Sequence, residues 1–174
     1  MRRAVVLLAL ALAACKTKQT QLSSNLAAEN KVTVRPVTLY YQGLDMLLGI
    51  EQRNVALPEN PAAAMPVVVR ELVKPPASPA RARSFPADTV VRAAYLLPDG
   101  TAFVDLGGAT LTQGWGTGSH EELMAVYAVV QTVTANFPEA RRVRILINGE
   151  PAETLAGHIN ISRSLAPAPS LVAR

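Results

Sequence analysis

The segment from Ser119 to Phe137 constrains the fold most, because it is the clearest stretch with a helical period. Its apolar residues recur three or four positions apart and share one helix face: Leu123, Val126, Tyr127, Val130, Val133 and Phe137. Ser119 and Glu122 have the spacing of a capping box, in which the Ser hydroxyl accepts one free N–H and the Glu reaches back. Pro138 stops the pattern. We predict an amphipathic helix whose apolar face lies in the core.

A hairpin precedes this helix. Residues 89–97 and 101–106 are rich in Val, Ala, Leu, Tyr and Phe, and they flank Pro98-Asp99-Gly100. Pro presets the turn angle, Asp bonds to the turn backbone, and Gly tolerates a positive φ. After the helix, residues 141–147 alternate basic and apolar side chains and lead into Asn148-Gly149, a strong hairpin signal. Residues 153–155 are the expected return strand.

Two strands and a helix are expected earlier in the chain. Residues 32–41 alternate in part, and residues 50–57 read as a weaker strand whose charges suit a sheet edge. Asn60-Pro61 is typical of a helix start, but Pro66 either kinks that helix or places its true start near Met65. Residues 74–88, rich in Pro, Ala, Arg and Ser, are expected to form a loop. The order predicts an α+β fold, a mixed or antiparallel sheet with two main helices on one face.

The N-terminus has the three parts of a secretory signal. A basic start, Met1-Arg2-Arg3, precedes an apolar run of Ala, Val and Leu that ends in Leu12-Ala13-Ala14-Cys15. This tetrapeptide resembles a bacterial lipobox, which implies cleavage before Cys15 and lipidation of that residue. The alternatives are a secreted protein without lipid, or an uncleaved anchor or core helix, although eleven apolar residues fall short of the roughly 20 that span a bilayer.

The predicted organisation has four parts. Residues 1–14 form the signal peptide, residues 15–30 a flexible tether, residues 31–162 one domain, and residues 163–174 a disordered tail. Cys15 is the only cysteine, so the exported domain has no disulfide and depends on packing. The expected location is outside the cytoplasm, lipid-anchored to the cell membrane, with inner or outer membrane left open.

Eight short segments then occur in a recognisable order: Val37-Thr38-Leu39-Tyr40-Tyr41, Glu51-Gln52-Arg53-Asn54-Val55, Arg70-Glu71-Leu72-Val73-Lys74-Pro75, Phe85-Pro86-Ala87-Asp88-Thr89, Asp99-Gly100-Thr101-Ala102-Phe103-Val104-Asp105-Leu106, Gly118-Ser119-His120-Glu121-Glu122, Tyr127-Ala128-Val129-Val130-Gln131-Thr132-Val133-Thr134 and Arg142-Val143-Arg144-Ile145-Leu146-Ile147-Asn148-Gly149. Together they resemble the GerMN domain, a module of a sporulation and spore-germination lipoprotein. Lys74 and Gly107 depart from the family pattern, which has Gly and Ser there.

The resemblance implies a fold like the ring-building motif of envelope secretion complexes, without known catalytic residues or cofactors. It implies a non-enzymatic module that supports assembly of an envelope complex. Its partners would be the membrane, through lipid on Cys15, and an envelope protein or further copies of the same chain. The alternative is a solute- or peptidoglycan-binding lipoprotein, against which the low aromatic content of 5% argues.

The glycine-rich segment 107–118 contains the only tryptophan. Trp115, with Gly114 and Gly116, is the candidate partner-binding loop, because Trp is enriched at binding hot spots; the alternative is a Trp packed over the sheet edge. No phosphate-loop motif is present.

Other chemistry is expected to be absent. His120, a nearby Glu and His158 could converge on a metal, but solvent-facing polar residues at a helix start are the simpler reading, so no metal site is predicted. Asp99 and Asp105 are assigned to the turn and the strand exit rather than to catalysis. The formal charge of +4 is scattered and includes Arg2 and Arg3, which excludes a nucleic-acid-binding stripe.

Overall fold

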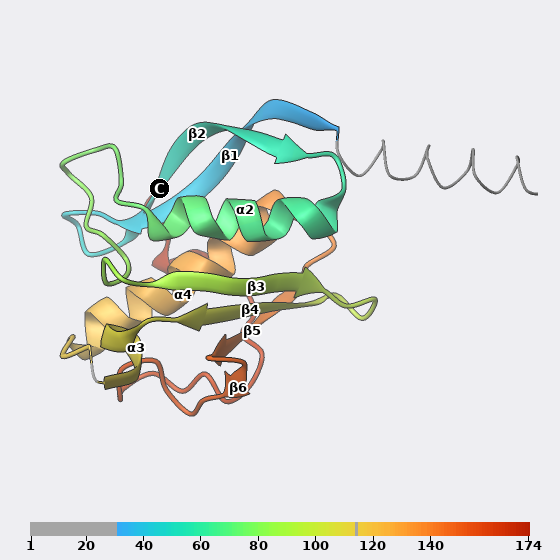
Figure 1. Cartoon of the computed structure of the whole chain (residues 1–174). Coiled ribbons are helices and arrows are strands. Elements are labelled where there is room, and N and C mark those ends of the chain that lie inside the picture. The colour runs from blue at the N-terminus through green and yellow to red at the C-terminus, as the bar shows by residue number, and fades with distance from the viewer. Residues whose placement is uncertain (1–30, 114) are drawn as a thin grey trace, which may run out of the picture.

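The computed structural model describes residues 31–113 and 115–174, arranged in three layers (Figure 1). One outer layer is a hairpin of β1 (Val32–Gln42) and β2 (Leu48–Pro58). The middle layer holds helices α2 (Pro61–Val73) and α4 (Ser119–Asn136). The other outer layer is a four-stranded sheet. The α+β class and the two helices against one face of this sheet are as predicted.

The four-stranded sheet has the order β3 (Val90–Leu96), β4 (Thr101–Gly107), β5 (Arg142–Ile147) and β6 (Glu150–Pro151). β3 and β4 are antiparallel, with a bulge between Val91 and Ala93. β4 and β5 are parallel, because the intervening α4 carries the chain back to the end of the sheet at which β4 begins. The sheet is therefore mixed, as predicted.

The predicted turns form, but one return strand is elsewhere. The Thr101 N–H donates to Asp99 Oδ1 at 2.9 Å in the first hairpin. Asn148 and Gly149 both have positive φ, 54° and 85°, as a two-residue turn of type I′ requires. Such a tight turn places the very next residues opposite β5, so Glu150–Pro151 pairs with it. The expected return strand at 153–155 is therefore wrong.

The hairpin is a separate sheet rather than part of a single one. β1 pairs only with β2 among the described residues, in register Val37↔Arg53. Side chains of α4 occupy part of the other edge of β1. Asn136 accepts from the Thr38 N–H at 3.0 Å and donates to the Thr38 carbonyl at 2.7 Å, and Thr132 Oγ1 accepts from the Tyr40 N–H at 3.2 Å. Polar groups of a helix thus take the place of a third strand.

α2 begins at Pro61 and runs through Pro66. Asn60 caps it, accepting from the Ala62 N–H at 2.9 Å. Pro66 cannot donate to the carbonyl of Ala62, but Ala62 is exposed, so water can satisfy that carbonyl. The alternative start near Met65 is therefore excluded.

The predicted capping box at the start of α4 does not form. The N-cap is Gly118, and no side chain caps it. Ser119 is the first helical residue, so its hydroxyl is not placed to cap. Glu122 is fully buried and turns away from the helix start to bind a later loop. The expectation that Glu122 is a solvent-facing residue fails with it.

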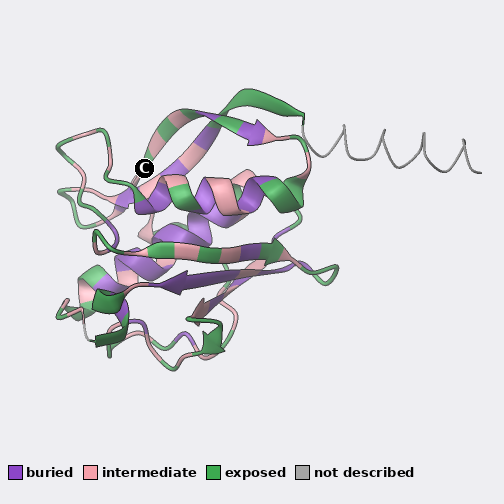
Figure 2. Ribbon diagram, in the orientation of Figure 1, coloured by how far each residue is buried: buried purple, intermediate pink, exposed green. Residues whose placement is uncertain are grey.

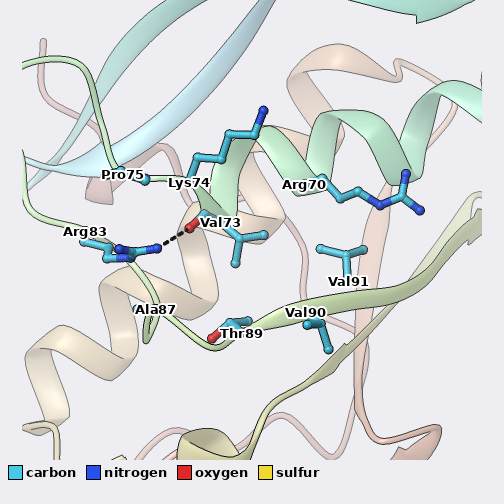
Figure 3. A pocket seen from close by; sticks show the side chains of 9 residues that line it. All are labelled: Arg70, Val73, Lys74, Pro75, Arg83, Ala87, Thr89, Val90 and Val91. Carbon is cyan, nitrogen blue, oxygen red and sulfur yellow. Dashed lines mark hydrogen bonds between the residues drawn. The ribbon is translucent and has the colours of Figure 1, made fainter.

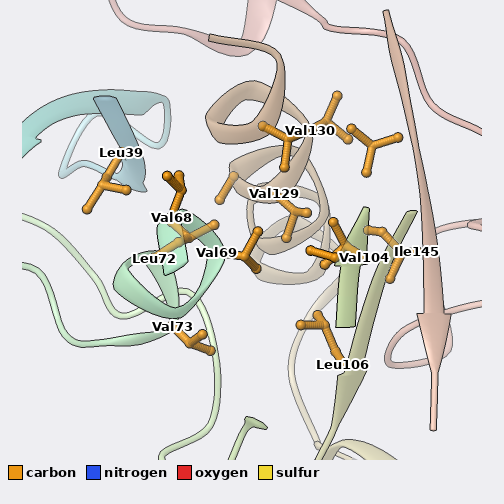
Figure 4. Close-up of a cluster of buried hydrophobic side chains, with 14 of the residues drawn as sticks. Leu39, Val68, Val69, Leu72, Val73, Val104, Leu106, Val129, Val130 and Ile145 are labelled. Atoms are coloured by element: carbon orange, nitrogen blue, oxygen red, sulfur yellow. The ribbon is translucent and has the colours of Figure 1, made fainter. Parts of the chain in front are cut away.

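Buried residues occur on both long helices and on strands of both outer layers (Figure 2). In Figure 4, Val68 and Leu72 of α2 lie between Leu39 of the hairpin and the rest of the core, and Val129 of α4 faces β4 and β5. α4 is buried well beyond the predicted stripe, because both sheets contact it. The additional buried residues include Met124, Ala125, Ala128, Val129 and Thr132.

The last twelve residues are ordered in the structure, against the prediction of a disordered tail. Leu165 exchanges two backbone hydrogen bonds of 2.8 Å with Val143 of β5. After a short 3₁₀ turn, Pro169–Leu171, the Ala173 N–H donates to the Leu48 carbonyl of β2 at 2.9 Å. The tail thus touches both sheets, which its Pro- and Ala-rich composition does not reveal.

The predicted signal peptide, Cys15 and the tether lie outside the described residues. Within residues 31–113 and 115–174, no helix has the length and apolar character needed to cross a membrane.

Candidate functional site

The loop predicted to bind a partner is anchored to the rest of the fold. It contains a short helix, α3 (Ala109–Gln113), where the sequence pattern predicted only a loop. The Thr110 N–H donates to Asp88 Oδ2 at 2.9 Å, and this bond holds the pKa of the Asp88 carboxyl below its ordinary value. Gly108 has φ 144°, and a Cβ there would lie 2.8 Å from the Asp88 carbonyl oxygen. Asp88 therefore fixes the start of the loop, from 22 residues upstream.

Trp115 is half-buried and stacks on Phe85, with ring centroids 6.1 Å apart and planes at 21°. Phe85 itself is only 2% exposed. The indole therefore packs on the loop between α2 and β3 rather than over a sheet edge. Gly116 has φ 65° and open space around it, as expected for a turn. Gly114 lies outside the described residues.

Beside Trp115 is a cavity of about 330 Å³, at the lower end of the range for ligand pockets. Its lining combines the indole, the Met124 thioether, the Gln42 amide and two opposite charges, Arg83 and Glu121. The cavity therefore offers both apolar contact and hydrogen-bonding groups. It has no cluster of groups suited to covalent chemistry.

The turn between β1 and β2 extends this surface. His120 Nε2, at the start of α4, lies 3.0 Å from the Met46 carbonyl oxygen, and the Gln42 amide lies 3.5 Å from Met46 Sδ. Leu44 is 86% exposed and Met46 is 46% exposed. We call the exposed turn residues Leu44 and Met46, together with Trp115 and Glu121 at the cavity, the Trp115 surface; Leu44 also borders a separate hollow with Asp45 and Arg81. The sequence pattern did not single out Leu44 and Met46. The available signal was that both are apolar side chains within a turn, where solvent exposure is expected.

The histidines do not converge. His158 Nδ1 lies 3.0 Å from Glu122 Oε2, whereas His120 contacts Met46. In the described part of the chain, no three His, Cys, Asp or Glu residues are grouped so that they could hold a metal ion.

Glu122 holds a loop rather than a ligand. Its carboxylate accepts from the backbone N–H groups of Leu155, Ala156 and His158 at 2.7–3.0 Å. Burial alone would raise the pKa of this carboxyl, but the backbone N–H groups outweigh burial and the pKa lies below its ordinary value. Glu122 is therefore an anion at neutral pH that ties α4 to the loop after β6.

The two aspartates have structural partners as well. Asp99 accepts from Thr101 and pairs with Arg142 at 2.7 Å. Asp105 accepts from the Gly149 N–H at 2.8 Å and pairs with Arg92 at 3.2 Å. Asp105 thus joins the exit of β4 to the turn after β5, close to the role assigned from sequence.

A family model described as "Germane: Sporulation and spore germination" matches residues 38–153. No curated protein sequence is significantly similar to the chain.

Three solved structures have a similar fold. The first GerMN domain of the sporulation protein GerM from Bacillus subtilis has a TM-score of 0.58 and 21% identity, over 76% of this chain and 97% of that one. The tandem GerMN domains of the same protein have a TM-score of 0.54 and 21% identity, over 77% of this chain and 46% of that one. A candidate lipoprotein from Clostridium perfringens has a TM-score of 0.55 and 19% identity, over 80% and 93%.

Proposed function

The chain belongs to the Germane family of sporulation and spore germination, and from this premise we propose that it is a lipid-anchored, non-enzymatic module of the cell envelope. In this proposal Cys15 carries the lipid, residues 15–30 form the tether, and the Trp115 surface binds a protein that takes part in an envelope complex.

The observation that carries the proposal is the Trp115 surface itself. It combines an indole held in place by Phe85 with a small cavity and two exposed apolar side chains, Leu44 and Met46. A rigid aromatic anchor next to a pocket is the arrangement found at the energetic centre of protein interfaces. Leu44 is 86% exposed and packs little within its own fold, so its side chain is available for burial by a partner.

The structural contacts of the acidic residues support a non-enzymatic role. Glu122 holds a backbone loop, Asp105 holds a turn, and Asp99 holds another turn. A general acid or base must be within reach of a substrate proton, and these carboxylates are engaged by the fold. One carboxylate, Glu121, and one guanidinium, Arg83, line the cavity beside Trp115.

The anchor is tested with Cys15→Ser. The wild-type protein should fractionate with membranes, and the variant should be released, because lipid on this cysteine is the proposed attachment. A variant that stays membrane-bound and uncleaved would contradict the lipid anchor.

The partner is tested by crosslinking and affinity capture of the lipidated protein from native membranes. We expect one defined envelope protein, or a ladder of the protein itself. The double variant Leu44→Ser with Met46→Ser should reduce recovery at least tenfold, since interface anchors each contribute on the order of 1–2 kcal/mol.

Val34→Ser is the matched control, because Val34 is also an exposed aliphatic residue (71%) but lies on β1 away from this surface. Equal recovery with both variants would contradict the assigned surface. Recovery of nothing from folded, lipidated protein would favour a solute- or peptidoglycan-binding role instead.

A further inference from the structure

A second cavity lies between α2 and β3 and shares Arg83 with the cavity beside Trp115. It has a volume of about 440 Å³ and is bounded by the C-terminal half of α2, the loop after it and the start of β3 (Figure 3). The volume is within the range of ligand pockets. The cavity is open on one side, so a bound group would keep a route to solvent.

Its interior is aliphatic and its rim is cationic. Val73, Val90 and Val91 contribute the apolar part, and Val90 is 53% exposed. Arg70 and Arg83 lie on either side of Val73 (Figure 3). No Asp or Glu belongs to the lining residues, so the site has an excess of positive charge.

The two arginines are available to an anion. Arg70 makes no ion pair within the described residues, and Arg83 makes only a 3.5 Å contact with the Val73 carbonyl. Lys74 is different: its amine pairs with Glu71 at 2.5 Å and points away from the valines in Figure 3. Lys74 is therefore not a candidate ligand group.

The end of α2 does not oppose an anion strongly. A helix C-terminus carries partial negative charge on its free carbonyls. Here the Glu71 carbonyl accepts from Tyr41 Oη and from Arg53, the Lys74 carbonyl accepts from Tyr41 Oη, and the Pro75 carbonyl accepts from Arg53. These contacts neutralise the helix end from the hairpin side.

We propose that this cavity binds an aliphatic carboxylate, with the aliphatic part over Val73 and Val91 and the carboxylate at the cationic rim formed by Arg70 and Arg83. The planar fork of a guanidinium matches the geometry of a carboxylate. Burial of an attached apolar group against the valines is favourable. Two sources share this chemistry: a free aliphatic acid, and the C-terminal residue of a peptide. The proposal does not depend on the Trp115 surface.

The test is titration of the full chain, as Cys15→Ser, followed by the amide resonances of Val73, Val90 and Val91 in ¹⁵N NMR spectra. Octanoate represents the free acid, and acetyl-Ala-Val-Val with a free carboxylate represents the chain end. Saturable shifts at these valines with either probe are expected, and whichever binds more tightly identifies the source. Octanol, acetate and the peptide amide each lack one half of the chemistry and should bind at least tenfold more weakly.

Variants separate a specific site from general attraction to a basic protein. Arg70→Gln and Arg83→Gln should each weaken binding about twofold to fivefold, the range of an exposed ion pair. Arg35→Gln removes the same charge from β1, outside the cavity, and should change nothing.

The proposal is overturned if neither probe shifts the three valines, if octanol binds as well as octanoate, or if Arg35→Gln weakens binding as much as Arg70→Gln.

Discussion

At the scale of single residues, Glu122 is the most deeply buried charged side chain among the described residues. It has no exposed surface, yet it is charged and makes hydrogen bonds to three backbone N–H groups and to His158. A buried charge is tolerated only when its oxygens are fully hydrogen-bonded. The loop from 155 to 158 therefore depends on this side chain for its position.

Glu122→Gln should lower the free energy of unfolding by about 3 kcal/mol, because the amide nitrogen of Gln cannot accept from a backbone N–H. Urea denaturation at neutral pH measures the difference. Glu121→Gln is the matched control: Glu121 is the exposed neighbour, and its change should stay within about 0.5 kcal/mol. Equal effects of the two variants would show that the loop is not held by Glu122.

The lowered pKa of the Glu122 carboxyl predicts that the folded protein loses stability in acid. The pKa of this carboxyl in the folded protein is below the ordinary value of 4.5, so the folded state binds its proton more weakly than the unfolded state does. The stabilisation is complete above pH 4.5 and is lost as the pH falls through the lower, folded-state pKa. The wild-type protein should lose stability more steeply than Glu122→Gln below pH 4.5, and parallel curves would refute this assignment.

At the scale of elements, α4 packs against both sheets through different kinds of contact. Toward the four-stranded sheet it presents aliphatic side chains such as Val129. Toward β1 it also presents Thr132 and Asn136, which satisfy backbone groups of the strand. This polar contact explains how a two-stranded hairpin, which is marginal by itself, is held in one position.

Thr132→Val tests the contact without changing the shape of the side chain. The Tyr40 N–H loses its acceptor, so the free energy of unfolding should fall by about 1–3 kcal/mol. Thr134→Val is the control on the same helix, because the Thr134 hydroxyl bonds to the Val130 carbonyl within α4, a bond that adds little to stability. Denaturant titration of both variants should give a clear loss only for Thr132→Val.

Local patterns predict elements well but not their partners. The Asn60 cap, the Asp99-Gly100 and Asn148-Gly149 turns and the apolar stripe of α4 were all readable, because each depends on residues close together in sequence. The role of Glu122 and the hydrogen bonds between Asn136 and Thr38 could not be predicted, because they join residues that are 33 to 98 positions apart in the sequence. For the candidate site, Trp115 was found as a lone aromatic, but its support by Phe85 is a long-range contact.

At the scale of the whole molecule, the C-terminal residues close the structure. They bond to β5 through Leu165 and to β2 through Ala173, and so link the two outer layers. Composition pointed to disorder, since backbone pairing to a distant strand has no signature in a segment of Pro, Ala and Ser.

Removal of residues 163–174 should therefore lower the free energy of unfolding by about 2–4 kcal/mol, from lost backbone hydrogen bonds and the packing of Leu165, Leu171 and Val172. Removal of Arg174 alone is the control and should have no measurable effect. A thermal unfolding midpoint that is the same for both truncations would mean that the tail contributes nothing.

Binding of a protein partner at the Trp115 surface of a lipid-anchored module is the central proposal. Its most direct measurement is photocrosslinking in intact cells, with a benzoylphenylalanine residue replacing either Leu44 on that surface or Asn54, an exposed residue of β2. We predict a discrete crosslinked species from position 44, reduced by Trp115→Ala, and none from position 54. Equal crosslinking from both positions, or none from position 44 in a folded and membrane-bound protein, would contradict the claim.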